Sequence, residues 1–270
     1  MSAPLFDAHN HLQDEWLAPH LAEIFPVLEK NNLRGAVVNG TCEADWGAVA
    51  SLAQQNEWVI PSYGLHPWFI ANRSPQWLEK LMEWASRSDC AIGEIGLDRW
   101  REPFDFADQQ QVFREQLAIA AERNLPVTIQ CLKAWGALWK IVKDAKLPEC
   151  GFLLHAYGGP LEMVHGFAER GARFSFSGYF LHERKSAQRE VFAQIPVDRL
   201  LVETDAPAMP LPPERREFSL PDVEVGTAIN HPANLIVAYR ALAEIRGMPL
   251  EELVAQVQEN FRRLFGGVMR

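Results

Sequence analysis

Apolar runs alternate with amphipathic stretches along the whole chain. A short apolar run bounded by turn residues is typical of a buried strand, whereas apolar residues at helical spacing indicate a helix. Eight strands are predicted, each followed by a helical stretch: residues 5–11, 34–40, 58–65, 90–97, 125–131, 151–156, 172–178 and 199–205. Eight consecutive β/α units predict the α/β class and a single closed (β/α)8 TIM barrel.

The helical pattern is clearest after the fourth strand, in "FADQQQVFREQLAIAAERN". Its apolar residues recur at helical spacing: Phe113, Leu117, Ala120 and Ala121. The "NLP" that follows predicts the end of this helix, because the residue before a proline disfavours helical backbone. A last helix is predicted to begin at Pro249 and to run through "LEELVAQVQENFRRLF", so the barrel carries an extra C-terminal helix.

The length of 270 residues is near the size of one TIM barrel, so residues 1–270 are expected to form a single domain. No low-complexity segment or linker divides the chain. Residues 206–233 are rich in proline and lack sustained periodicity, which predicts a long loop beside the barrel mouth.

Composition excludes several classes of protein. No apolar stretch approaches the roughly 18 residues needed to cross a bilayer, so no membrane association is expected. The four cysteines form no C-x-x-C pair and the start of the chain has no secretory pattern, which favours a cytoplasmic protein with reduced thiols. The net charge of −9 opposes tight nonspecific binding of long nucleic acid. No obligate protein partner is evident.

Polar, ionisable residues stand at the ends of the predicted strands, where the active sites of TIM barrels lie. They are His9 and His11 in "FDAHNHL", His66 in "YGLHP", Glu94 and Asp98 in "IGEIGLD", His155 in "FLLHAYGG", and Glu203 and Asp205 in "LVETDAP". Each residue alone is more often a hydrogen-bonded polar group than a ligand. Several such groups converging on one mouth would remain uncompensated unless a cation neutralised them, so together they predict a metal site.

The ordered motifs resemble those of the TatD-family metal-dependent hydrolases, a (β/α)8 branch of the amidohydrolase superfamily. The matching stretches span nearly the whole chain: "FDAHNHL", "GLHPW", "GEIGLD", "LPVTIQC", "FSFSGYF", "LLVETDAPAM" and "NHPANL". The resemblance implies a deoxyribonuclease that hydrolyses phosphodiester bonds of DNA with one or two divalent ions, Mg, Mn or Zn. It further implies a small or single-stranded nucleic-acid substrate at the barrel mouth.

The resemblance also implies the metal ligands. His9, His11, Glu94 and Asp205 would hold the first ion, and His155 with bridging Glu94 would hold the second. At the end of the fifth strand, however, the chain has Gln130 and Leu132 where the family pattern has His and Arg. Gln130 is therefore expected to be a weak second-metal ligand, since a neutral amide oxygen binds transition metals less strongly than imidazole. A one-metal enzyme, or a Gln130 that hydrogen-bonds an altered substrate, remains an alternative.

Catalytic and substrate-binding roles follow from the same positions. Asp205 is the candidate general base, because it would lie beside the activated water. Glu94 is favoured as a bridging ligand, and its catalytic role would change if only one ion binds. Four residues are expected to contact substrate: His66, Asp98, Arg99 and Trp100. The alternative interpretations are a turn residue for His66 and a solvated loop for "DRWR".

Two other classes of function remain open. The same barrel and His-x-His pair serve the hydrolysis of esters, lactones and cyclic amides, and the acidic charge and Leu132 favour that alternative. The second alternative is a metal-poor accessory or binding protein that has lost part of its site. The complete first ligand set argues against it.

Overall fold

A computed structural model describes residues 3–86, 89–103, 105–223 and 226–269, and it contains an eight-stranded parallel sheet in the order β1 to β8. The strands are β1 Leu5–Asn10, β2 Leu33–Asn39, β3 Val59–Tyr63, β4 Ala91–Asp98, β5 Val127–Leu132, β6 Phe152–Leu154, β7 Ala172–Ser177 and β8 Leu200–Glu203. Backbone hydrogen bonds close the seam between the last and first strands, from Asp205 N to His9 O at 2.9 Å and from His11 N to Ala206 O at 2.8 Å. The predicted TIM barrel is confirmed.

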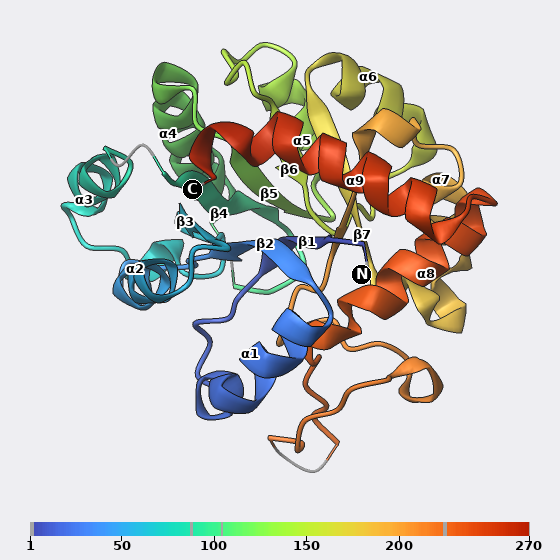
Figure 1. Cartoon of the computed structure of the whole chain (residues 1–270). Coiled ribbons are helices and arrows are strands. Elements are labelled where there is room, and N and C mark those ends of the chain that lie inside the picture. The colour runs from blue at the N-terminus through green and yellow to red at the C-terminus, as the bar shows by residue number, and fades with distance from the viewer. Residues whose placement is uncertain (1–2, 87–88, 104, 224–225, 270) are drawn as a thin grey trace.

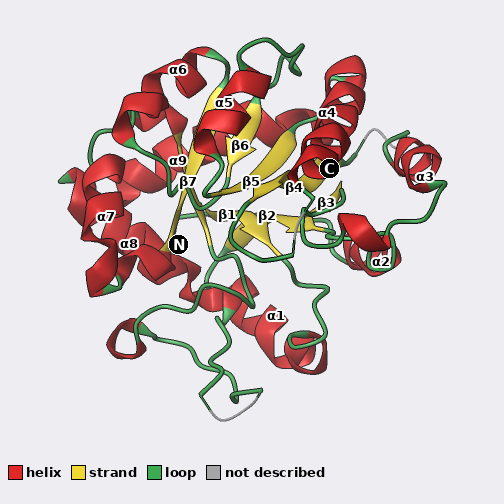
Figure 2. Cartoon of the chain, turned by 180° about the vertical axis from the view of Figure 1, so that it is seen from behind, coloured by secondary structure: helices red, strands yellow, loops and turns green. Residues whose placement is uncertain are grey.

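Helices surround this sheet, and the strands lie inside the ring that they form (Figures 1 and 2). The helices are α1 Leu21–Lys30, α2 Trp46–Gln55, α3 Trp77–Trp84, α4 Phe106–Arg123, α5 Trp135–Val142, α6 Val164–Glu169, α7 Ser186–Phe192, α8 Leu235–Arg246 and α9 Leu250–Phe265. α9 follows the eighth β/α unit, so the extra C-terminal helix is confirmed.

The longest helix, α4, shows how local sequence sets its ends. The Asp105 side chain accepts hydrogen bonds from the backbone N–H groups of Ala107 and Asp108, which caps the N-terminus. At the other end Asn124 adopts a φ of 53°, the left-handed conformation that often ends helices. The apolar positions predicted for its inner face are all buried.

Side chains alternate between the two sides of each strand, and β7 shows the result. Phe174 and Phe176 pack outward among aromatic rings, and the Phe176 ring lies 5.1 Å from that of Phe192 on α7. Ser175 has the opposite orientation and donates a hydrogen bond to Glu203 on β8. The barrel therefore has an apolar outer layer under the helices and a polar interior near its mouth.

Six strands, β1, β2, β3, β6, β7 and β8, end one or two residues earlier than predicted, and the ends of β8 and β6 bear on the site. β8 ends at Glu203, because Asp205 has a φ of 53°, outside the extended region. β6 ends at Leu154, so His155 begins the following turn. Asp205 and His155 thus lie just beyond their strands, whereas His9 and Glu94 lie within β1 and β4.

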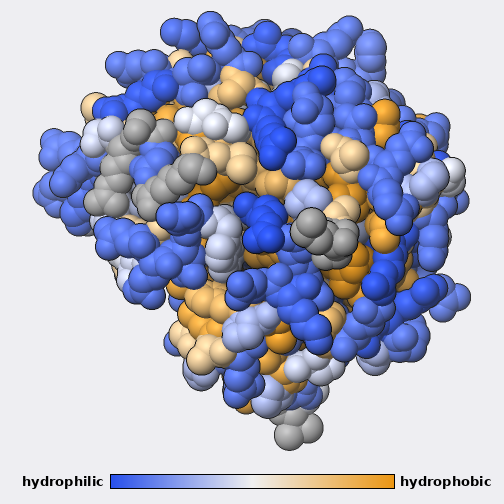
Figure 3. Space-filling model, in the orientation of Figure 1, coloured by the Kyte–Doolittle hydropathy of each residue, from blue (hydrophilic) through white to orange (hydrophobic). Residues whose placement is uncertain are grey.

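The long loop predicted over 206–233 is confirmed in its described part, which excludes residues 224 and 225. It contains the short 3-10 turns Pro213–Arg215 and Pro232–Asn234 and an isolated bridge between Ser219 and Asn230. The face of the molecule drawn in Figure 3 is mainly hydrophilic, with smaller apolar patches. Within the described ranges, no helix combines the length and hydrophobicity required to span a bilayer.

Candidate metal centre

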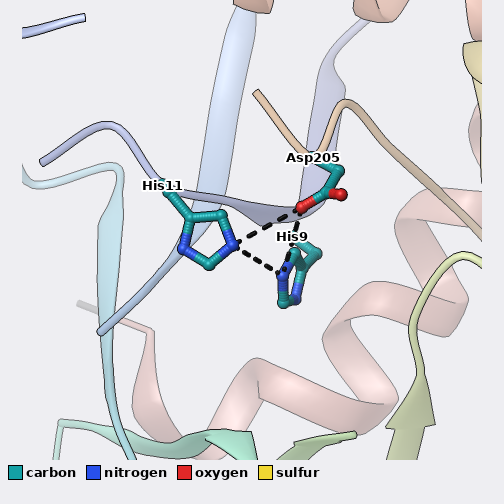
Figure 4. Close-up of side chains that lie close together, drawn as sticks. All are labelled: His9, His11 and Asp205. Carbon is teal, nitrogen blue, oxygen red and sulfur yellow. Dashed lines mark hydrogen bonds and ion pairs between the residues drawn. The ribbon is translucent and has the colours of Figure 1, made fainter. Parts of the chain in front are cut away.

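Four side chains converge at the mouth of the barrel from three strands. His9 is the next-to-last residue of β1 and His11 follows the strand, with their Nε2 atoms 3.3 Å apart, and Asp205 approaches both rings (Figure 4). Asp205 Oδ1 lies 3.6 Å from His9 Nε2 and 3.5 Å from His11 Nε2. Glu94 of β4 brings Oε2 to within 3.4 Å and 3.3 Å of the same two nitrogens.

These separations match those of ligands around a metal ion. Four ligand atoms placed tetrahedrally about 2.0–2.1 Å from a centre are about 3.3–3.4 Å from one another. The five distances that involve a histidine, between His9 and His11 and from each of them to Glu94 and Asp205, run from 3.3 to 3.6 Å. Two imidazoles and two carboxylates also form a donor set suited to Zn²⁺ or Mn²⁺. The residues therefore fit a divalent cation.

The charges of this cluster support the same conclusion. Burial alone would raise the pKa of Glu94, but the surrounding imidazoles hold it well below its usual range. Burial also opposes ionisation of Asp205, yet the hydrogen bond with His11 and the nearby histidines lower its pKa. Burial lowers the pKa of His9. Both carboxylates are thus ionised at neutral pH and could act as ligands.

Asn39, at the end of β2, orients both histidines of the first strand. His11 Nδ1 donates to the Asn39 carbonyl oxygen at 2.7 Å, which leaves His11 Nε2 free to coordinate. The Asn39 side-chain amide lies 3.1 Å from His9 Nδ1 and accepts a hydrogen bond from Thr128 Oγ1 at 2.6 Å. The sequence analysis missed this residue, although "VVNG" places it at a strand end like the candidate ligands.

A second buried network supports the backbone that carries Asp205. Asp7 accepts hydrogen bonds from Thr204 N at 3.0 Å and Thr204 Oγ1 at 2.6 Å, and burial raises its pKa to about 7. Asn230, from the "NHPANL" segment, donates to Thr204 O at 2.8 Å. This segment therefore positions the turn after β8, a role that the sequence alone did not suggest.

His155 occupies the opposite side of the cluster and contacts three polar residues. Its Nε2 lies 2.7 Å from Gln130 Oε1 and 3.0 Å from Glu94 Oε1, while its Nδ1 is 3.5 Å from Glu203 Oε1. Burial would lower the pKa of His155, but the charges of Glu94 and Glu203 hold it well above its usual range. His9, Glu94 and His155 form a second group whose donor atoms could share an ion.

The residues predicted to contact substrate have different surroundings. His66 Nε2 faces Glu94 Oε1 at 3.6 Å, and burial lowers the His66 pKa to about 4. The Asp98 carboxylate accepts hydrogen bonds from the backbone N–H of Trp100 at 2.6 Å and from the Trp68 indole at 2.9 Å. The Arg99 guanidinium stacks on Phe106, 4.2 Å from the ring centroid. Trp100 remains more than half exposed.

A cavity of about 230 Å³ opens above this cluster. It is lined by His11, Asp14, Trp16, Thr41, His66, Trp68, Phe69, Glu94, Gln130, His155, Asp205, Pro207 and Ala208. His66 is thus the predicted substrate contact that lines it directly, whereas Asp98 orients the loop behind it. Neither lysine nor arginine occurs among the described residues of this lining.

Comparison with known proteins shows the family of this chain. The sequence profile described as "TatD related DNase" matches residues 6–266, nearly the whole chain. The chain belongs to this TatD family. The TatD member named "3'-5' ssDNA/RNA exonuclease TatD" from Erwinia tasmaniensis is 30% identical over 97% of this chain and 99% of that protein.

Other TatD relatives match this chain over a similar length. A protein of Bacillus subtilis named "Uncharacterized metal-dependent hydrolase YabD" is 29% identical over 97% of this chain and 98% of its own length. The crystal structure of YjjV, a TatD homologue from Escherichia coli, superposes with a TM-score of 0.89 at 27% identity, over 98% of this chain and 99% of that chain.

Proposed function

We propose that this TatD-family protein is a divalent-metal-dependent deoxyribonuclease that hydrolyses phosphodiester bonds. The observation that carries the proposal is the convergence of two histidines and two carboxylates at the barrel mouth: the Nε2 atoms of His9 and His11 lie 3.3 Å apart, and each lies 3.3 to 3.6 Å from a carboxylate oxygen of Glu94 and of Asp205. The names of relatives as a metal-dependent hydrolase and as a single-strand exonuclease support the choice of substrate.

In this proposal His9, His11, Glu94 and Asp205 would hold a first ion, and His155 with Glu94 would hold a second, weaker one with Gln130. A divalent cation at the first position would lower the pKa of a water molecule and polarise a phosphoryl oxygen. A small or single-stranded nucleic acid would bind in the cavity above, with no further protein required.

Two side chains then have separate tasks. Asp205 is ionised, so it accepts the proton of the attacking water. His66 Nδ1 accepts a hydrogen bond from Trp68 N at 3.1 Å, so the proton of this neutral ring lies on Nε2, which faces Glu94. From there His66 donates a hydrogen bond to a phosphate oxygen. Arg99 and Trp100 stay predicted contacts at the rim, for substrate that extends beyond the cavity.

The test combines a metal count with an activity assay. Protein stripped with a chelator is reloaded with Mg²⁺, Mn²⁺ or Zn²⁺ and given a 5′-labelled single-stranded oligonucleotide, whose shortening is followed. His11→Ala should lose most bound metal and activity while keeping its circular dichroism spectrum. His165→Ala is the matched control, because the His165 side chain is 86% exposed on α6, and it should keep both properties. Equal metal content and turnover in His11→Ala would refute the proposed site.

One observation favours a second candidate function, the hydrolysis of a small ester, lactone or cyclic amide. The described lining of the cavity contains no lysine or arginine, whereas polyanion binding usually draws on such side chains. A panel of these small substrates beside the oligonucleotide separates the two functions. Hydrolysis of the small substrates alone would replace the first proposal with the second.

A further inference from the structure

Exposed tryptophans line the cavity beside the metal ligands. Trp16, in the loop after β1, is 40% exposed, and Trp68, in the loop after β3, is 37% exposed. Both line the same cavity as Glu94 and Asp205. Large aromatic side chains usually bury most of their surface, so two exposed rings at the mouth of this cavity indicate a ligand-binding surface.

Trp68 is held in a fixed orientation. Its indole N–H donates to Asp98 Oδ2 at 2.9 Å, and its ring meets the His66 ring edge to face at 5.0 Å. The Arg101 guanidinium lies over the Trp68 ring, 4.7 Å from its centroid, and the Trp100 ring is 6.2 Å away. A ring already held by its neighbours loses little entropy when a ligand stacks on it. Arg101 also adds positive charge beside this ring.

The side chains that line the cavity indicate which kind of ligand it binds. Because the described lining has no lysine or arginine, contacts to a phosphate backbone can supply only part of the affinity. Stacking of a base on tryptophan supplies affinity without cationic groups and without sequence preference. The cavity of about 230 Å³ is also smaller than the roughly 300–1,000 Å³ typical of ligand sites, a size that suits one base rather than a paired end.

We propose that Trp68, with Trp16, forms a stacking subsite for the unpaired base of the terminal nucleotide, next to the phosphodiester that is hydrolysed. This inference rests on the proposed nuclease function and deepens it. The site then recognises its substrate by an aromatic contact and by the metal centre, and a paired end is a poor substrate because its terminal base is stacked within the duplex.

The experiment compares two single-stranded oligonucleotides that differ only at the 3′ end, one with a normal terminal nucleotide and one abasic there. In the wild type, kcat/KM should be about ten- to hundredfold higher for the base-bearing end, the range that one base–aromatic stack provides. Trp68→Ala should abolish this preference, because it lowers kcat/KM for the base-bearing end far more than for the abasic end. Trp68→Phe keeps a ring but loses the bond to Asp98, and it should retain most of the preference. Trp16→Ala should reduce it.

Three results would overturn the inference: a wild type that does not distinguish the two ends, a Trp68→Ala variant that slows both equally, or a Trp68→Phe variant that behaves like Trp68→Ala. The last two would assign Trp68 to positioning of Asp98 and His66. If neither oligonucleotide is hydrolysed, the nuclease proposal fails, and the subsite is tested by binding instead. A deoxynucleoside monophosphate should then bind more tightly than deoxyribose phosphate, and Trp68→Ala should remove the difference; equal binding would overturn the subsite.

Discussion

Replacing Gln130 by histidine tests how many metal ions the site holds. In the structure Gln130 Oε1 is 2.7 Å and Glu94 Oε1 is 3.0 Å from His155 Nε2. These are hydrogen-bond distances, shorter than the approximately 3.3–3.4 Å between ligands that share a tetrahedral ion. The first position already has the wider spacing. We therefore expect the wild type to bind one ion tightly and a second ion weakly.

The magnitude follows from two changes at the second position. A metal ion there must separate His155 Nε2 from its two oxygen neighbours by about 0.3–0.7 Å, which breaks the hydrogen bond with Gln130. Gln130→His removes that bond and supplies an imidazole, a stronger ligand for Zn²⁺ or Mn²⁺ than a neutral amide. We expect the second ion to bind about ten- to hundredfold more tightly in the variant, a change of about 1.4–2.8 kcal/mol.

Metal titration by calorimetry and elemental analysis after gel filtration measure the stoichiometry directly. Gln130→Met is the control, because it has a similar length and loses the amide without gaining an imidazole; its second site should stay weak. Two ions bound tightly by the wild type, or no gain in Gln130→His, would refute the reasoning. Gln130 would then be assigned to substrate binding. Hydrolysis need not increase in the variant, since Leu132 still lacks a cation.

Three further predictions use the same structure. Asp205→Asn should retain bound metal and lose about two to four orders of magnitude in hydrolysis, the contribution of a positioned base; near-normal turnover by the metal-loaded variant would assign the base elsewhere. Asn39→Ala removes the side-chain amide beside His9 Nδ1 but keeps the backbone oxygen that accepts from His11, so it should weaken metal binding about ten- to hundredfold in a chelator competition through His9 alone; unchanged affinity would remove the Asn39 side chain from the support of His9. Burial lowers the pKa of His231 from 6.5 to about 4. Between these values the histidine is protonated in the unfolded chain but neutral in the folded one, so the free energy of unfolding falls as the pH drops from 7 to 5. His231→Asn keeps an acceptor for Ala233 N and should escape up to about 2 kcal/mol of that loss in urea unfolding; equal losses in both proteins would contradict the assignment.

Sequence predicted those parts of the fold that depend on local patterns. The apolar runs located the strands because every buried parallel strand needs apolar side chains, and α4 was evident from its helical spacing. The convergence of His9, His11, Glu94 and Asp205 followed from their positions at strand ends, since a barrel brings those ends to one mouth.

The pattern of apolar and polar residues could not predict contacts between segments that are distant in the sequence. The hydrogen bonds from Asp7 to Thr204 and from Asn39 to Thr128 depend on which side chains meet inside the closed barrel. The pattern of polar residues does not fix those partners. Trp68 was visible within "GLHPW", but its contact with Asp98 joins two loops whose relative placement only the fold determines.

The seam of the barrel lies directly under the proposed metal position. His9 and His11 leave the first strand, Asp205 leaves the last, and two backbone hydrogen bonds join them there. An ion held by all three side chains would be a reversible cross-link between the two ends of the barrel. Such an ion would link residues at opposite ends of the eight-stranded sheet. It would also stabilise the folded chain, because only the folded state brings these three side chains together. The concentration of metal would then affect how long the barrel stays closed as well as its catalytic activity. Without the ion, the barrel would begin to open between β1 and β8, the first and last strands of the chain.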